Sequence, residues 1–275
     1  MRAGYAGGLE FVAFFGSGIL NDTRWSVETE VQTSTLKLRN VGFSYAQVPV
    51  LRGISLDVAA GEIAVLIGRN GAGKSTLLRC AAGWSSPSEG EVEILGQSLR
   101  DADRQLRREL VLVTDTPPFY DDLTAREHVQ FVLRANHLGQ RLAEAERLLD
   151  TLGLRDAAGG YPSTFSRGMR YKLALVLALA VRPRLLLLDE PFGPIDPVSA
   201  GELWQELRSL ASTGNAVLMS THQLPEGAAP DRYFVLDGGT IVDAGSWSGH
   251  GTECATTLDG LLRSATDAAE SPHGA

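Results

Sequence analysis

The sequence contains very little cysteine. Cys80 and Cys254 are the only two among 275 residues. They lie far apart, and neither belongs to a CxxC pair or has a histidine cluster beside it. This spacing matches neither a disulfide framework nor a cysteine-based zinc site. The composition is therefore typical of a protein in a reducing cytoplasm.

Long hydrophobic runs are also missing. The longest apolar stretch, residues 173–188, is interrupted by Arg182, Pro183 and Arg184, whereas a bilayer-spanning helix needs roughly 18 or more unbroken apolar residues. Residues 9–20 are apolar apart from Glu10 and could pass for the core of a short signal peptide. Only Arg2 precedes them and no cleavage site is obvious, so residues 1–33 are interpreted as a flexible extension.

Positive charge is scarce. The 25 Lys and Arg residues are outnumbered by 33 Asp and Glu residues, which gives a formal net charge of −8. No global positive field exists to attract nucleic acid, so we expect no nucleic-acid partner. A hydrophobic content of 44% is enough for a chain of this length to bury a full core.

Two kinds of strand pattern are present. Residues 36–41 and 54–58 alternate apolar with polar side chains, which predicts a small antiparallel sheet with one exposed face. Residues 62–68 and 185–190 contain continuous apolar runs, which are typical of parallel strands covered on both faces. The sequence therefore predicts an α/β fold with a mostly parallel core sheet.

Helical patterns lie between these core strands. Thr124 and Glu127 form a capping box that opens a helix over residues 124–136, and leucines at helical spacing predict a second helix over 141–154. We interpret residues 100–178 as an inserted helical subdomain. A glycine-rich turn inside residues 233–242 predicts a hairpin, and residues 246–275 are interpreted as a tail.

A phosphate-binding loop is indicated by GRNGAGKST, residues 68–76, which follows an apolar strand and opens a helix. A backbone curled through such glycines points its amides at phosphate oxygens, and the helix N-terminus adds positive potential. We expect Lys74 to bridge the β and γ phosphates of ATP and Ser75 to bind Mg²⁺. The other residues predicted to contact the nucleotide here are Gly68, Asn70, Gly71, Gly73 and Thr76.

An acidic pair completes the predicted site. Asp189 and Glu190 end the apolar run LLLLDE, which lies well after the loop lysine. We expect Asp189 to hold Mg²⁺ through water. Glu190 is predicted to act as general base or to orient the attacking water, because hydrolysis needs a carboxylate just beyond the γ phosphate.

With these motifs in place, residues of about 35–245 resemble the ABC ATPase family. That resemblance implies a P-loop NTPase core, flanked by helices, with an N-terminal antiparallel β subdomain and an inserted helical subdomain, here within residues 34–245. FSRGM, residues 165–169, resembles the family's LSGGQ signature. Ser166 and Gly168 are then implied to contact the γ phosphate held by a second ATP-binding subunit, identical or different, so that active sites form between two subunits.

Further residues are assigned by the same resemblance. Asp196, in PIDP, is similar to the acid of the family's D-loop, His222 to its switch histidine, and Tyr45 to the aromatic that stacks on adenine. Asp115 stands where the family has the glutamine of its Q-loop, and we predict it as a further Mg²⁺ ligand. The alternative is that it only starts the turn before Pro117 and Pro118.

The resemblance also implies a partner. Residues 119–122, Phe-Tyr-Asp-Asp, follow where the family receives the coupling helix of a transmembrane permease. The hypothesis is an ATP-binding subunit of an ABC transporter that hydrolyses ATP at a dimer interface. It would be peripheral on the cytoplasmic face of the cell membrane, held there by its permease.

The signature's serine, glycine and methionine, together with the lack of an importer-type C-terminal regulatory domain, resemble bacterial ABC-2-type exporters. Two alternatives stay open. One is a soluble ABC ATPase acting on ribosomes or DNA, which typically carries two ATPase units or a long coiled-coil insertion. The other is a regulatory module that holds ATP without hydrolysing it, which the presence of Lys74, Asp189, Glu190 and His222 disfavours.

Overall fold

The fold is that of a computed structural model, which describes residues 34–101, 104–247 and 260. The predicted N-terminal extension, residues 1–33, lies outside the described residues. So does nearly all of the predicted tail, including Cys254. The predicted ATPase domain, residues 34–245, is described almost throughout.

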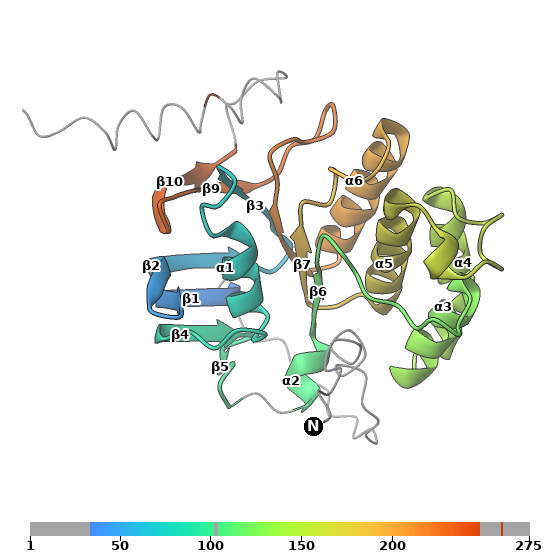
Figure 1. Cartoon of the computed structure of the whole chain (residues 1–275), viewed down its shortest axis with the longest axis horizontal. Helices are drawn as coiled ribbons and strands as arrows, with labels where there is room; N and C mark the ends of the chain where they lie inside the picture. The colour runs from blue at the N-terminus through green and yellow to red at the C-terminus, as the bar shows by residue number, and fades with distance from the viewer. Residues whose placement is uncertain (1–33, 102–103, 248–259, 261–275) are drawn as a thin grey trace, which may run out of the picture.

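A four-stranded antiparallel sheet lies at one side of the molecule (Figure 1). Its first two strands contain the predicted segments 36–41 and 54–58 but run longer, because Ala46 and Gln47 form a tight turn with positive φ values of 45° and 70°. Such turns match the twist of a hairpin. In the order β2-β1-β4-β5, the strands are β1 (Ser34–Tyr45), β2 (Val48–Ala59), β4 (Glu89–Ile94) and β5 (Gln97–Ser98).

The second sheet has six strands in the order β10-β9-β3-β8-β7-β6. All neighbours pair in parallel except β10 and β9, which form the hairpin predicted from the glycine-rich turn. In chain order the strands are β3 (Ile63–Gly68), β6 (Leu110–Val113), β7 (Leu185–Asp189), β8 (Ala216–Ser220), β9 (Arg232–Asp237) and β10 (Thr240–Ser246).

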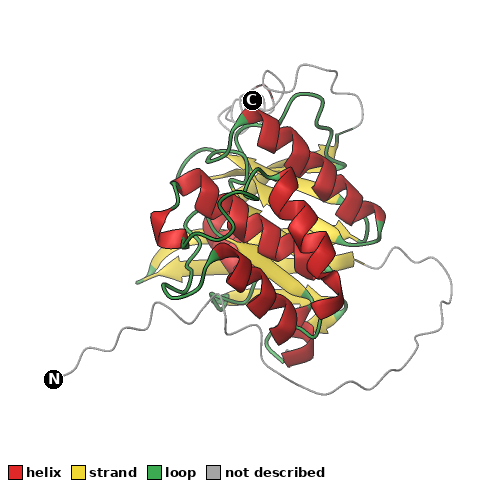
Figure 2. Ribbon diagram, turned by 90° about the vertical axis from the view of Figure 1, so that its right-hand side faces the viewer, coloured by secondary structure: helices red, strands yellow, loops and turns green. Residues whose placement is uncertain are grey.

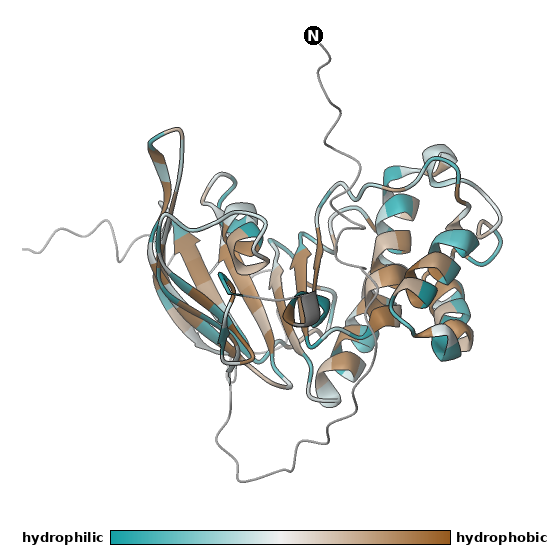
Figure 3. Ribbon diagram, turned by 90° about the horizontal axis from the view of Figure 1, so that it is seen from below, coloured by the Kyte–Doolittle hydropathy of each residue, from teal (hydrophilic) through white to brown (hydrophobic). Residues whose placement is uncertain are grey.

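The parallel strands are buried on both faces, which explains their continuous apolar sequences. In β3, Ile63, Val65 and Ile67 belong to the core formed with the large helices. Ala64 and Leu66 belong to the core formed with α1 and the small sheet. The hydrophobic colouring of these strands in Figure 3 agrees with this double burial.

The helices form two layers on the six-stranded sheet. Helix α1 contacts β2 of the small sheet and β3, β7 and β8 of the large one. Helices α3, α4, α5 and α6 gather on the other side (Figures 1 and 2). The helices are α1 (Lys74–Ala81), α2 (Arg104–Arg108), α3 (Ala125–Ala135), α4 (Leu142–Thr151), α5 (Arg167–Val181) and α6 (Pro197–Ser212), with short 3-10 turns at Gly139–Arg141 and Pro162–Thr164.

The predicted helix signals are present, with one correction to the helical region. Thr124 and Glu127 form the complete capping box at the start of α3, and α4 ends just before Gly153. However, the predicted helical subdomain, residues 100–178, includes β6, which pairs with β7 in the large sheet. Four apolar residues are too short a run to distinguish a strand from a helix by periodicity.

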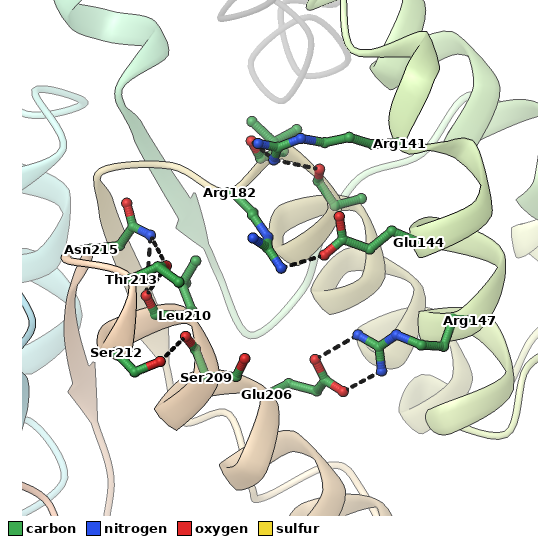
Figure 4. A network of polar contacts seen from close by, with 12 residues as sticks. Arg141, Glu144, Arg147, Arg182, Glu206, Ser209, Leu210, Ser212, Thr213 and Asn215 are labelled. Atoms are coloured by element: carbon green, nitrogen blue, oxygen red, sulfur yellow. Dashed lines mark hydrogen bonds and ion pairs between the residues drawn. The ribbon is translucent and has the colours of Figure 1, made fainter.

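Charged side chains join the helical layer together (Figure 4). Arg147 of α4 donates to both carboxylate oxygens of Glu206 in α6 at 2.6 and 2.9 Å. Glu144 pairs with Arg182 at 2.7 Å. Arg141 donates to the carbonyls of Ala180 and Val181. It thereby satisfies acceptors that the last turn of a helix leaves free.

The longest apolar stretch of the sequence is divided between a helix and a strand. Helix α5 ends at Val181 and β7 begins at Leu185, with the charged residues Arg182 and Arg184 between them. Within the described residues, no helix has both the length and the apolar character needed to cross a bilayer.

We expect Leu66→Ala to destabilise the fold by about 2–5 kcal/mol, since it removes a fully buried side chain between the two sheets. Urea denaturation of the two proteins in the same buffer measures this. Val48→Ala is the matched control, because Val48 is 65% exposed and its loss is expected to change the free energy of unfolding by about 0.5 kcal/mol or less. Equal midpoints for Leu66→Ala and the parent would contradict the described core.

Candidate active site

The phosphate-binding loop lies between β3 and α1. Gly73 at its end has φ +107°, a conformation that side chains rarely adopt, and a Cβ there would lie 2.9 Å from Leu51 of the small sheet. Asn70 and Gly71 form the exposed tip of the loop, whereas Thr76 is buried in the first turn of α1. The loop is therefore fixed by both sheets while its tip stays open.

The N-terminus of α1 has neither a side-chain cap nor an acidic residue in its first turn. Its amides are thus available to an anion. Lys74, only 7% exposed, donates from Nζ to the Gly68 carbonyl at 2.8 Å. The same Nζ lies 3.4 Å from Oε1 of Glu190. The amine therefore stays paired across the loop.

Glu190 connects two other segments. Its Oε2 lies 2.7 Å from Nδ1 of His222, so one carboxylate joins Lys74 to His222. Glu190 itself has a positive φ of 51°, which a non-glycine residue adopts only when its surroundings hold it there. Its amide donates to the Ser220 carbonyl at 3.1 Å. This strained position aims the carboxylate at the loop.

Asp189 is buried, and two residues that sequence reasoning missed support it. Ser220 donates its hydroxyl to Oδ1 of Asp189 at 2.6 Å, and Tyr171 of α5 donates to the Asp189 carbonyl at 2.9 Å. Burial, and then the negative charges of Asp189, Asp115 and Glu190, raises the pKa of Tyr171 far above its ordinary value. Tyr171 therefore stays protonated and remains a donor. A single tyrosine in an apolar helix carries no sequence signal for this role.

The predicted signature and D-loop residues form a second group. Ser166 caps α5, accepting from the Met169 amide at 3.2 Å. Gly168 lies against the Pro194 carbonyl, which a Cβ would approach to 2.6 Å. Asp196 caps α6 and pairs with Lys172 at 2.7 Å.

The hydrogen bonds from Lys172 and Ser199 hold the pKa of the Asp196 carboxyl well below its usual range, so it is charged at neutral pH. Among the described residues, no hydrogen bond or ion pair joins Ser166, Gly168 or Asp196 to the Lys74–Glu190–His222 chain. The structure therefore joins Lys74, Glu190 and His222 directly, whereas Ser166, Gly168 and Asp196 make their contacts elsewhere.

Tyr45 and Asp115 lie at the margins of the site. Tyr45 ends β1 and is 46% exposed, and its ring lies edge-on to that of Phe43 with 4.8 Å between the ring centroids. Asp115 follows β6 and is exposed, yet it is close enough to Tyr171 to contribute to that residue's raised pKa. Because β6 pairs in parallel with β7, Asp115 and the pair Asp189 and Glu190 lie at the same edge of the sheet.

Oxygen donors suited to Mg²⁺ are present around the loop. Oδ2 of Asp189 and the hydroxyl of Ser75 make no hydrogen bond with any described residue, and both lie at the ends of elements that meet at the loop. Within the described ranges, no three or more His, Cys, Asp and Glu side chains cluster closely enough to hold a metal by themselves. These residues fit a cation that takes further ligands from phosphate oxygens.

Comparisons with known proteins agree with this geometry. The sequence profile of the ABC transporter family matches residues 51–193. The lipoprotein-releasing system ATP-binding protein LolD of Ruegeria sp. is 36% identical over 222 residues, which cover 76% of this chain and 98% of LolD. The methionine import ATP-binding protein MetN of Rhizobium etli is 34% identical over 239 residues, 82% of this chain and 66% of MetN.

The chain belongs to the ABC transporter family. A bacterial ABC transporter cassette solved as a dimer superimposes with a TM-score of 0.70 at 27% identity, covering 78% of this chain and 99% of that one. This ABC ATPase is thus an ATP-binding subunit with the P-loop fold of transporter cassettes, and it hydrolyses ATP. ATP-binding subunits of the family dimerise and work with a transmembrane permease.

For this ABC ATPase we expect Glu190→Gln to lower the ATPase rate by about 100-fold or more, because hydrolysis loses its predicted base. The amide keeps the size of the side chain, so the phosphate-binding loop is unchanged and ATP stays bound. Size-exclusion chromatography in MgATP should therefore show a stable dimer.

The control is Glu202→Gln, which removes an exposed acid of α6 and should leave rate and elution as in the parent. A Glu190→Gln protein that hydrolyses ATP at the parental rate would show that Glu190 has been assigned the wrong role.

Proposed function

We propose that this chain is the ATP-binding subunit of an ABC-2-type exporter, acting as one of two ATP-binding subunits on a separate transmembrane permease. The observation that carries the proposal is the Glu190 carboxylate, held between Lys74 and His222. These contacts place the predicted general base, Glu190, beside a histidine and a phosphate-binding amine at one edge of the large sheet.

The proposed dimer rests on the division of the predicted residues into two groups. Ser166 and Gly168 open α5 and have no bond to the chain through Glu190. A serine hydroxyl and a glycine amide at a helix N-terminus are suited to bind a phosphate. Placing them against the ATP of a second subunit, identical or different, would complete both sites.

We assign Mg²⁺ to Ser75, Asp115 and Asp189, with Asp189 acting through water. When bound, Mg²⁺ neutralises charge on the phosphates. Around it, Lys74 would bind the β and γ phosphates, and Glu190 would take a proton from the attacking water or orient it. Ser220 and Tyr171 would keep Asp189 in place through the bonds described above.

The permease docking site is assigned to the loop between β6 and α3. One side of this loop lines an open pocket of about 480 Å³ together with Arg79 and Trp84. Asp115 and Pro118 lie in that lining, and Asp121 and Asp122 are exposed beyond it. A partner helix bound here would lie next to Asp115 and hence next to the nucleotide site.

The proposed direction of transport is export, and the proposed location is the inner face of the cell membrane, through the permease. Support for export comes from the FSRGM segment, whose serine, glycine and methionine resemble ABC-2-type exporters. Overall identity does not separate the alternatives, since it is 36% to LolD and 34% to MetN.

The test of docking places a photocrosslinking amino acid at position 121, whose side chain is exposed. In the native cell we expect it to crosslink to a membrane-spanning polypeptide. The same crosslinker at position 155, where the arginine side chain is 64% exposed on the helical layer, is the matched control and should give no such product. Crosslinking from position 155 alone, or from neither position, would contradict the assigned docking site.

We further expect Asp115→Asn to need several-fold more Mg²⁺ for half-maximal ATPase activity. The substitution keeps size and turn preference but removes a charged oxygen, and Mg²⁺ in nucleotide sites usually takes one or two carboxylates. Titrating Mg²⁺ at fixed ATP measures this, with Asp121→Asn as control in the same loop. Superimposable magnesium curves for Asp115→Asn and the parent would leave the carboxylate with no role at the metal.

A further inference from the structure

His128 lies buried beneath the β6–α3 loop, residues 114–124, with 3% of its surface exposed. Its Nδ1 lies 2.9 Å from the Thr124 carbonyl, and its Nε2 accepts from the Tyr120 amide at 3.0 Å. A carbonyl can only accept and an amide can only donate. Both bonds therefore require one form of the ring, the neutral tautomer protonated on Nδ1.

The rings of the loop pack around this histidine. Phe119 meets it edge-on with centroids 5.4 Å apart, and Tyr120 stacks on it at 6.0 Å. Phe131, which lies on α3 as His128 does, meets the Tyr120 ring edge-on with 5.6 Å between the ring centroids. The two aromatic residues assigned to the docking site are thus fixed by α3, with His128 at the centre.

A second contact attaches the same loop to α5. Arg170 donates from Nη2 to the Pro117 carbonyl at 3.3 Å, and its guanidinium lies 5.8 Å from the centre of the Phe119 ring. Arg170 is one helical turn after Ser166, and its amide donates to the Ser166 carbonyl. A displacement of the start of α5 would therefore move Arg170 and, through its two contacts, displace Pro117 and Phe119.

We propose that His128 and Arg170 are positioning residues that clamp the β6–α3 loop, His128 to α3 and Arg170 to the signature end of α5. The clamp presents Phe119 and Tyr120 in one orientation and connects them to Ser166. A role of the clamp in coupling ATP hydrolysis to the permease rests on the proposed docking function of the loop. Whether the clamp itself exists can be tested in the isolated chain.

The clamp is sensitive to acid. Protonation would turn Nε2 into a donor facing the Tyr120 amide, another donor, so this bond would be lost. Burial lowers the pKa of His128, and the nearby Thr124, Asp122 and Glu127 oppose that shift without reversing it. The other titratable groups around the ring are Tyr120 and, across Phe119, Arg170.

The sign of the pH effect follows from this lowered pKa. The folded state binds a proton less readily than the unfolded chain, whose histidine has a pKa near about 6.5. The free energy of unfolding therefore falls as pH drops below that value, and stops falling once pH passes the folded pKa. The bond from the Tyr120 amide to His128 should therefore hold the loop on α3 at neutral pH and be lost in acid.

The test is hydrogen exchange on the full chain without nucleotide, resolved at the Tyr120 amide. We expect His128→Leu to lower its protection about fivefold, the effect of losing one hydrogen bond. His128→Gln keeps an acceptor and should restore most of it. In the parent, protection should fall on acidification through the His128 pKa, and in His128→Gln it should not.

Arg170→Met should raise exchange of the amides of residues 119–122. Arg155→Gln, which removes an exposed arginine of the same layer, should not. Ring ¹⁵N shifts of His128 in the parent provide a measurement that needs no variant, and should show the proton on Nδ1 at neutral pH.

A proton on Nε2, or equal Tyr120 protection in His128→Leu and the parent, would overturn the clamp. Because nucleotide and partner are absent, these results do not depend on ATP-driven dimerisation or on the docking assignment. If the proposed dimerisation is wrong, the Glu190→Gln experiment will show it, and if the docking assignment is wrong, the crosslinking experiment at position 121 will show it.

Discussion

The parallel pairing of β3, β8 and β7 is the constraint on which the site depends. It brings the ends of all three strands to one edge of the sheet. Gly68, Ser220 and Asp189 end these strands, so Lys74, His222 and Glu190 emerge side by side. Residues more than a hundred positions apart in sequence thereby share one carboxylate. Any change that shifted the strand register by one residue would move every one of these groups.

The geometry around Glu190 shows how a buried scaffold maintains a strained, charged position. Glu190 keeps its positive φ while its amide donates to the Ser220 carbonyl. The carbonyl of the neighbouring Asp189 accepts a hydrogen bond from the Tyr171 hydroxyl. A protonated tyrosine next to several carboxylates supplies a hydrogen bond without adding charge. The apolar helix α5 therefore does more than cover the sheet, because it also fixes the backbone next to Glu190, the predicted general base.

The same helix, α5, also contacts the β6–α3 loop through Arg170. Strand β6 ends beside β7, so the β6–α3 loop starts next to Asp189 and passes over α3 and the start of α5. Arg170 and His128 hold this loop from two helices. The predicted nucleotide site, the signature segment and the proposed docking surface are thus connected through α5. Under the proposed function, this connection is the route by which a change at ATP would reach a partner.

Local sequence determined much of this protein. The glycine-rich loop, the run ending in Asp189 and Glu190, the capping box at Thr124 and the hairpin turn each have a short-range physical cause, and each has the expected structure. Position along the chain did not reveal that β6 belongs to the large sheet, since four apolar residues have no decisive period.

Only the tertiary structure decided which side chains meet. The supports of Asp189 by Tyr171 and Ser220, the pairing of Asp196 with Lys172 and the bond from Arg170 to the Pro117 carbonyl all join separate elements of the fold. Such contacts are set by how strands and helices pack, and a single sequence carries no local pattern for them.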